Sequence, residues 1–300
     1  MSTRKYGRSL EALSLDVETL GTSKSEVSRT FVARTEAKLA DFLQRPLDGE
    51  DLPVVMLDGI QVDDHVLLVA LGINREGFKQ VLGVWEGTTE SEETCRSLLS
   101  ELVSRGLVVE RARLFVIDGG KGLRKAIRKV FGKWALIARC RVHKMRNVAD
   151  HLPKNKQAWV KAQMRRAYTS NSAEDAKRRL LQLASSLEQS YPSAASSLRE
   201  GLDETLTVLK LDVGPRLTAT LSSTNPIENL NGSIRVITRR VKRWRGGSMA
   251  MRWTATALLE AEQRFRRVKG YREMPALIAS LKALCSSTCN VTIDTMEDAA

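Results

Sequence analysis

The sequence predicts an α/β fold in which a mixed five-stranded sheet is flanked by helices and interrupted by an all-helical insertion. Three observations lead to this class. Apolar runs rich in β-branched residues follow one another at residues 53–62, 65–73 and 80–88, with short polar turns between them. Strand-like runs then alternate with helical periodicity, and a long stretch of helix-patterned segments follows.

The elements after the first three strands determine the kind of α/β fold. Residues 91–106 place leucines at helical spacing and end at Gly106. Residues 112–120 form a fourth strand without polar alternation, so both of its faces should be covered. Residues 122–132 form a second helix and residues 134–140 a fifth strand. The order β-β-β-α-β-α-β is that of the ribonuclease H-like fold, not the repeated βαβ of a dinucleotide-binding domain.

Changes of pattern along the chain predict its domain organisation. The N-terminal unit has two helices around a turn at Gly21-Thr22, with Ser23 and Glu26 spaced as a capping box for the second helix. A DNA-reading helix-turn-helix and a plain helical hairpin fit this pattern equally well. The predicted segments are an N-terminal helical unit at 1–50, the first part of the core at 51–150, a helical insertion at 151–220, the completion of the core at 221–272 and a C-terminal tail at 273–300.

Composition narrows the classes of function. With 48 Lys and Arg against 35 Asp and Glu, the net charge is +13, which favours a polyanionic partner such as nucleic acid over a protein that is merely basic. No apolar run has the length of a membrane span, and the N-terminus lacks the apolar stretch of a signal peptide. The 4 cysteines form no disulfide framework or paired zinc motif. We therefore expect a cytoplasmic, nucleoid-associated protein without membrane contact.

The fourth strand ends in a carboxylate, Asp118, followed by Gly119 and Gly120. The sequence gives only weak support to a phosphate-binding loop, because neither GxxxxGK followed by Ser or Thr nor GxGxxG occurs here. Two interpretations remain for Asp118. It either forms a turn or caps the following helix, or it is one of several metal-binding carboxylates.

A second carboxylate, Asp58, follows the first strand-like run in "VVMLDGI". In a ribonuclease H-like sheet the first and fourth strands are adjacent and parallel, so Asp58 and Asp118 are expected to converge. The alternative is a tight hairpin turn at Asp58-Gly59. Asp63 and Asp64 are rival carboxylates, but they lie on the turn side of the second strand, so Asp58 is preferred.

A third carboxylate, Glu228, is expected on the first turn of a late helix. Asn225 as N-cap, Pro226 as first helical residue and Glu228 as third would also make a capping arrangement. An apolar stripe at helical spacing forms the buried face of this helix: Ile227, Leu230, Ile234, Ile237 and Val241. Another face should carry Glu228 and a row of cations suited to a nucleic-acid backbone: Arg235, Arg239 and Lys242.

These features resemble the Mutator-type insertion-sequence transposases of bacteria, a family of DDE recombinases. The resemblance spans residues 53 to about 265. Five ordered motifs carry it: "LDGI" at Asp58, "LGINREGFKQVLGVWEG" at 71–87, "VIDGGKGL" at Asp118, "RCRVHKMRN" at 139–147 and "STNPIENLN" at 223–231.

The resemblance implies a catalytic, metal-binding triad of Asp58, Asp118 and Glu228 that acts on DNA. Hard carboxylate oxygens suit Mg²⁺, with Mn²⁺ as a substitute. The expected partners are the terminal inverted repeats of the element, target DNA, and further copies of the chain on the DNA ends. Besides the three cations of the late helix, Arg243 and Lys121 are predicted to contact DNA.

Two motif residues, Cys140 and His143, form the family's Cys-x-x-His element, whose role the sequence leaves open. Half of a zinc site, with His151 nearby, is one interpretation, and a structural or DNA-positioning role is favoured over it. Trp244 either stacks on a base or sugar or belongs to the core.

Two departures from the family pattern bear on the function. Cys95 stands where relatives usually carry Trp, and relatives have a longer region before the first strand. The short N-terminus suggests an alternative in another class, a truncated, non-catalytic remnant that binds DNA ends without cutting them. The triad favours the enzyme over the remnant. A third alternative is a general Mg²⁺-dependent nuclease, but such an enzyme would need no helical insertion and no module that binds the DNA ends.

Overall fold

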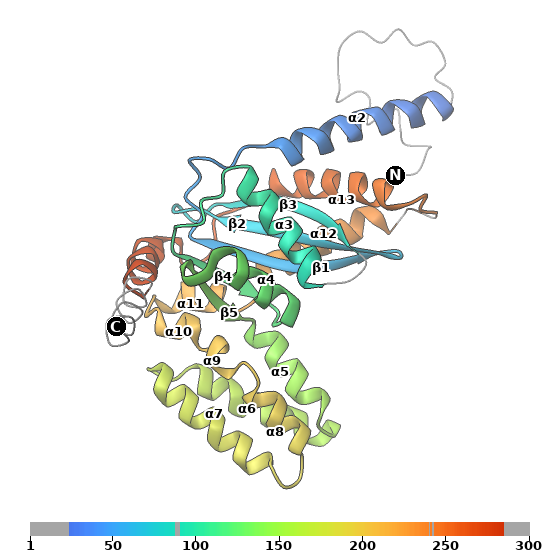
Figure 1. The fold of residues 1–300 in the computed structure, drawn as a ribbon. Helices are drawn as coiled ribbons and strands as arrows, with labels where there is room; N and C mark the ends of the chain where they lie inside the picture. The colour runs from blue at the N-terminus through green and yellow to red at the C-terminus, as the bar shows by residue number, and fades with distance from the viewer. Residues whose placement is uncertain (1–23, 88–90, 240, 242, 285–300) are drawn as a thin grey trace, which may run out of the picture.

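The computed structural model describes residues 24–87, 91–239, 241 and 243–284 (Figure 1). Its centre is a five-stranded sheet of order β3-β2-β1-β4-β5. The strands are β1 (Val54–Val62), β2 (His65–Ile73), β3 (Lys79–Gly87), β4 (Arg113–Ile117) and β5 (Ala135–Arg139). The first three strands pair antiparallel, whereas β4 pairs parallel to β1 and to β5. The predicted α/β class with a mixed five-stranded sheet is confirmed, and its topology is consistent with the ribonuclease H-like fold.

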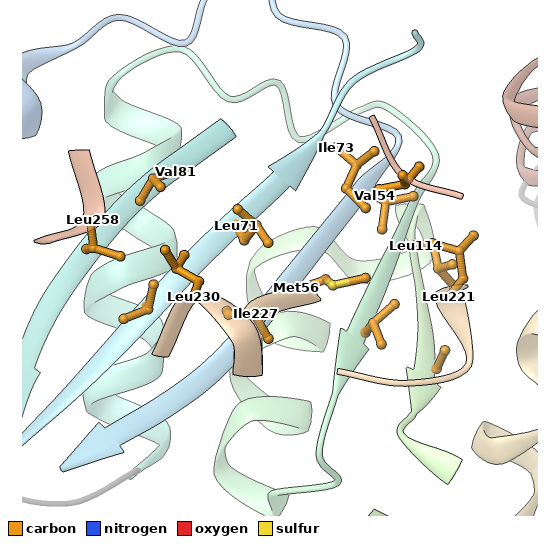
Figure 2. Close-up of a cluster of buried hydrophobic side chains, with 14 of the residues drawn as sticks. Val54, Met56, Leu71, Ile73, Val81, Leu114, Leu221, Ile227, Leu230 and Leu258 are labelled. Carbon is orange, nitrogen blue, oxygen red and sulfur yellow. The ribbon is translucent and has the colours of Figure 1, made fainter. Parts of the chain in front are cut away.

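Helices cover both faces of the sheet (Figure 1). On one face, α3 (Glu92–Ser104) and α4 (Lys121–Phe131) pack on the odd-numbered residues of β1 and β4, such as Val55 and Phe115. On the other, α12 (Asn225–Thr238) and α13 (Gly247–Glu262) pack on the even-numbered residues. Figure 2 shows this second cluster, with Ile227 and Leu230 of α12 over Met56 of β1. Every residue of β4 is buried, as its unbroken apolar run predicts.

Most helices between β5 and α12 form a hydrophobic cluster of their own, centred on residues such as Val160, Leu180 and Leu198. The last of these helices instead contribute Val208, Leu217 and Leu221 to the cluster that α12 and α13 form with the sheet. In Figure 1 most helices of this segment lie below the sheet, and α5 is the helix that connects them to β5. The helices are α5 (Arg141–Asp150), α6 (Lys154–Tyr168), α7 (Ala173–Leu187), α8 (Pro192–Arg199), α9 (Leu202–Thr205), α10 (Thr207–Lys210) and α11 (Pro215–Leu221). The boundaries of the insertion, 151–220, stay a prediction.

The N-terminal helix α2 (Lys24–Gln44) packs along α13 (Figure 1). The ring centroids of Phe31 and Trp253 lie 5.1 Å apart, and Arg252 donates a hydrogen bond of 3.1 Å to Thr35 Oγ1. The predicted preceding helix, the Gly21-Thr22 turn and Ser23 lie outside the described residues. No described helix combines the length and apolar character needed to cross a membrane.

Part of the predicted C-terminal tail is folded. Residues 274–284 are helical, and Met274, Leu277 and Leu281 are buried in the cluster that α12 and α13 share with the sheet. The 273–300 segment is therefore not a tail throughout, because its apolar residues recur at helical spacing. The polar segment 286–300 lies outside the described residues.

Candidate functional site

Asp58 lies in β1, and Asp118 directly follows β4, the strand that pairs parallel to β1. The register pairs Val54 with Leu114 and Met56 with Val116, and extending it by two residues would bring Asp58 beside Asp118. Because side chains alternate across a strand, Asp58 belongs to the face of Met56, which α12 covers. Both aspartates are half-buried. The convergence of the two carboxylates stays a prediction.

Asp58 lies inside β1, not at its end. It pairs with Val69, and the strand continues to Val62, where the hairpin turn is made by Asp63 and Asp64. Asp63 adopts a left-handed φ of 55°, a conformation that Asp tolerates better than most residues. The alternative of a hairpin turn at Asp58-Gly59 is therefore wrong, and the rival carboxylates sit beyond the far end of the strand.

Asp118 forms a turn and does not cap α4. Its Oδ1 accepts a hydrogen bond of 2.9 Å from the backbone N–H of Gly120, which is itself the N-cap residue of the helix and makes no side-chain cap. Gly119 between them has φ 110°, and a Cβ there would lie 2.0 Å from Arg139 Nε. Glycine is therefore favoured at this position both by the positive φ and by the lack of room for a Cβ atom.

Glu228 faces the same side of the sheet through α12. Three residues further along this helix, Asn231 donates a hydrogen bond of 2.8 Å from Nδ2 to Asp58 Oδ2. Residues three apart are neighbours on a helix surface, so Glu228 lies on the part of α12 that meets β1. The sequence analysis missed Asn231, although a polar residue next to the apolar stripe of Ile227, Leu230 and Ile234 could have indicated it. The triad itself stays a prediction.

The predicted cap of α12 is wrong in its details. The helix begins at Asn225, and Thr224 is the N-cap residue without a side-chain capping bond. Pro226 therefore lies in the second helical position and Glu228 in the fourth. Glu228 Oε1 does not return to the backbone but accepts a hydrogen bond of 2.6 Å from Thr224 Oγ1. Thr224, which is completely buried, was also missed.

Cys140 and His143 lie beside Glu228, and one ligand atom from each of the three falls within 4.8 Å of the others. Cys140 follows β5, and its N–H donates to the Ile117 carbonyl at 2.8 Å, which places it level with Asp118. His151, the further ligand considered for zinc, is exposed at the C-cap of α5 and lies outside this group.

Hydrogen bonds and nearby charges perturb the pKa values of this pair. The hydrogen bond with Cys140 raises the pKa of His143, and the negative charges of Glu228 and Asp118 act in the same direction against the effect of burial. Burial opposes ionisation of Cys140, but hydrogen bonds with His143 and Thr224 outweigh it and lower the pKa of the thiol. His143 therefore interacts electrostatically with both Glu228 and Asp118, two carboxylates of the predicted site.

The predicted row of cations on one helical face is not formed as expected. Helix α12 ends at Thr238, so only Arg235 lies within it, and it is exposed. Arg239 is the C-cap residue, Lys242 lies outside the described residues, and Arg243 is exposed in the segment after the helix. Similarly, the buried stripe stops at Ile234, Ile237 is half-buried, and Val241 follows the helix.

Two other predicted residues are placed as follows. Trp244 is half-buried and packs against the cluster between α12, α13 and the sheet, so its ring contributes to the core. Lys121 is exposed as the first residue of α4, directly after the Asp118 turn. The position that departs from the family pattern, Cys95, is fully buried on α3.

Buried cations join the sheet to the helical insertion behind this site. Arg139 Nη1 donates to the Glu200 carbonyl at 3.2 Å, and Lys144 Nζ donates to the carbonyls of Ser197 and Glu200. Lys144 is 1% exposed. Desolvation, followed by the nearby charge of Arg139, lowers the pKa of Lys144 to about 8.

We predict that Lys144 makes folding stability rise with pH in the alkaline range. Between about pH 8 and its ordinary 10.5, the unfolded chain binds more protons at this residue than the folded one. The free energy of unfolding therefore gains up to ~3 kcal/mol from this residue across that window, and none below it. Denaturant titrations at several pH values should show that Lys144→Met removes the gain, while the exposed Lys154→Met keeps it. An unchanged pH dependence in Lys144→Met would contradict the prediction.

Comparison with known proteins identifies the family. A sequence model of the family described as "Transposase, Mutator family" matches residues 1–268. A probable insertion-sequence transposase of Corynebacterium diphtheriae is 28% identical over 271 residues, covering 85% of this chain and 77% of its own. The transposase of element IS6120 of Mycolicibacterium smegmatis is 28% identical over 270 residues, with coverages of 88% and 80%. The transposase of element ISRM5 of Rhizobium meliloti is 30% identical over 254 residues, with coverages of 81% and 62%. The chain belongs to the Mutator family of transposases.

Proposed function

We propose that the chain is a DNA transposase that binds the terminal inverted repeats of its own insertion element and catalyses metal-dependent strand cleavage and strand transfer. The observation that supports the proposal is that Asp58 and Asp118 each come two residues after a paired residue of two parallel strands, beside a helix that Asn231 ties to Asp58 and that bears Glu228. Membership of a transposase family supplies DNA as the substrate class.

The side chains fit a divalent-cation site by their chemistry. Asp58, Asp118 and Glu228 are all half-buried carboxylates, accessible from solvent yet fixed in direction. Each has one oxygen held by the protein, through Asn231 Nδ2, the Gly120 N–H and Thr224 Oγ1 respectively. Hard oxygen donors of this kind suit Mg²⁺ or Mn²⁺. These three carboxylates would hold the ions.

The chemistry follows from that ligand set. Two divalent ions, when bound, activate a water or a 3′-hydroxyl and stabilise the leaving 3′-oxygen in an in-line displacement. The chain's own contribution is orientation, because the hydrogen bonds to the carboxylates restrict their rotation before substrate arrives. No Ser or Tyr nucleophile is needed, and one site serves both hydrolytic nicking and joining of the 3′-end to target DNA.

The test is cleavage of a labelled duplex that carries the element's terminal repeat. We expect binding in Mg²⁺, Mn²⁺ or Ca²⁺, nicking at the repeat end in Mg²⁺ and Mn²⁺, and joining of the labelled end to a plasmid target. Binding without nicking in Mg²⁺ and Mn²⁺ would favour the non-catalytic remnant. Nicking of any duplex, without preference for the repeat, would favour a general nuclease.

A second prediction concerns the basic residues near the end of α12. Replacing Arg235, Arg239 and Lys242 with Ala should weaken binding to any duplex and reduce the salt dependence of log K by about 0.9 for each phosphate that the variant no longer neutralises. The matched control is Arg178→Ala with Arg179→Ala on α7, two exposed arginines that pair with Asp175. If the α12 variant keeps the affinity and salt slope of the control, its cations do not contact DNA.

A further inference from the structure

The buried hydroxyl of Thr224 is the common partner of three side chains around Glu228. Its Oγ1 lies 2.6 Å from Glu228 Oε1, 3.3 Å from His143 Nδ1 and 3.3 Å from Cys140 Sγ. Thr224 comes from the turn before α12, Cys140 and His143 from the start of α5, and Glu228 from the first turns of α12. The hydroxyl therefore joins two segments that are far apart in the sequence.

The proton of this hydroxyl can be assigned from chemistry. A threonine hydroxyl has one proton to donate and two lone pairs. The shortest contact is with the carboxylate of Glu228, the strongest acceptor of the three, so the proton points there. A lone pair of the hydroxyl then accepts from His143 Nδ1, which is the ring nitrogen that donates, and the hydroxyl contacts Cys140 Sγ at 3.3 Å. The backbone N–H of Thr224 is also bound, to Cys140 Sγ at 3.4 Å.

Cys140, His143 and Glu228 are also of ligand types that zinc accepts, with one atom from each within 4.8 Å of the others. Zinc would need sulfur, nitrogen and oxygen ligands at roughly 2.0–2.3 Å from one centre. The centre that these three atoms share is the Thr224 hydroxyl, at hydrogen-bonding distances of 2.6 to 3.3 Å. In this arrangement the three ligand atoms surround the hydroxyl group of Thr224.

We propose that Thr224, held by Cys140 and His143, is a positioning residue that sets the orientation of the Glu228 carboxylate for metal binding. The inference rests on the proposed function, in which Glu228 is a metal ligand. It gives the Cys-x-x-His element a role that requires no metal of its own. The element fixes the hydroxyl, and the hydroxyl fixes Oε1 of the carboxylate.

A structural role as helix cap does not account for the hydroxyl. Thr224 is the N-cap residue of α12, but its side chain makes no capping hydrogen bond, and its carbonyl receives the N–H groups of Ile227 and Glu228. Thr224→Val keeps the shape and the carbonyl and removes only the hydroxyl. Thr224→Ser keeps the hydroxyl and is the matched control.

The experiment measures Mn²⁺ binding without turnover. The full chain is bound to a terminal-repeat duplex that ends at the cleavage position in a 3′-dideoxynucleotide, and free Mn²⁺ is followed by electron paramagnetic resonance. We expect Thr224→Val to weaken Mn²⁺ binding by about 10-fold or more, as removal of a ligand's hydrogen-bonding partner typically does, and Thr224→Ser to bind within a few fold of wild type. Equal Mn²⁺ affinity of Thr224→Val and wild type, with Glu228→Gln weakened, overturns the proposal alone. Wild-type affinity in Glu228→Gln overturns the proposed function as well.

A second pair of variants keeps the test decisive if Thr224→Val does not fold. His143 is half-buried, and Asn can place a side-chain N–H near Nδ1 whereas Gln reaches toward Nε2. We expect His143→Asn to bind Mn²⁺ nearly as wild type does and His143→Gln to bind several-fold more weakly; equal affinities overturn the proposal.

The zinc content of the purified protein is a further test. If wild-type protein contains stoichiometric zinc and Cys140→Ser does not, the hydroxyl-centred arrangement is overturned. Purified wild-type protein without zinc supports the arrangement.

Discussion

Replacing Glu228 with Gln is expected to abolish Mg²⁺-dependent strand cleavage and joining by several orders of magnitude while leaving folding and DNA binding intact. The amide keeps the size of the side chain and an oxygen that can accept the hydrogen bond from Thr224 Oγ1. It lacks the negative charge, and Mg²⁺ is held in proteins mainly through carboxylates. The measurement is nicking and joining of the labelled terminal-repeat duplex, together with its binding affinity.

The matched control for this change is Glu260→Gln on α13. Glu260 is exposed and pairs with Arg264 one turn away, so its replacement should leave cleavage unchanged. If Glu228→Gln cleaves as fast as wild type, Glu228 only supports the start of α12 and the triad is wrong.

Replacing Asp58 with Asn should have an effect of the same size, and Asp63→Asn should have almost none. Asp58 lies in β1 and is hydrogen-bonded by Asn231 of α12, whereas Asp63 lies on the β1–β2 turn. Asn tolerates the left-handed φ of 55° at position 63, so the control should also fold normally. Asn at position 58 can still accept the hydrogen bond from Asn231. The measurement is the cleavage rate of each variant at saturating DNA. A loss of activity in Asp63→Asn with full activity in Asp58→Asn would show that Asp63, and not Asp58, is the metal-binding residue.

The sheet could be predicted because its strands depend on local patterns. Apolar runs of β-branched residues define each strand, and the unbroken run of β4 indicates burial on both faces. The parallel pairing of β1 with β4 follows from the order of elements. Given that pairing, Asp58 and Asp118 come two residues after the paired Met56 and Val116.

Other features depend on tertiary contacts that periodicity does not encode. The apolar spacing of α12 continues to Ile237 and Val241 in the sequence, with no glycine or proline to end the helix before Gly246, yet the helix ends at Thr238. Asn-Pro is a common start for a helix, but here the N-cap is Thr224, whose N–H and hydroxyl both contact Cys140. Asp58-Gly59 resembles a turn pair, but Gly59 pairs with Leu68 inside the sheet.

The site residues that the sequence analysis missed share one property. Asn231 and Thr224 are buried polar side chains whose partners, Asp58 and Cys140, lie 173 and 84 residues away. A buried polar group is costly unless it is hydrogen-bonded, so such residues imply a partner without identifying it. Only the fold identifies the partner.

The central claim, a divalent-cation site formed by the carboxylates of Asp58, Asp118 and Glu228, is tested most directly by anomalous X-ray diffraction from crystals of the chain bound to the non-reactive terminal-repeat duplex and soaked in Mn²⁺. We predict anomalous peaks between the carboxylates of Asp58 and Asp118, with Glu228 as a further ligand and Mn–O distances typical of hard oxygen donors, about 2.0–2.6 Å. Mn²⁺ bound instead at Asp63 and Asp64, or between Cys140 and His143 with the two strand aspartates unliganded, would contradict the claim.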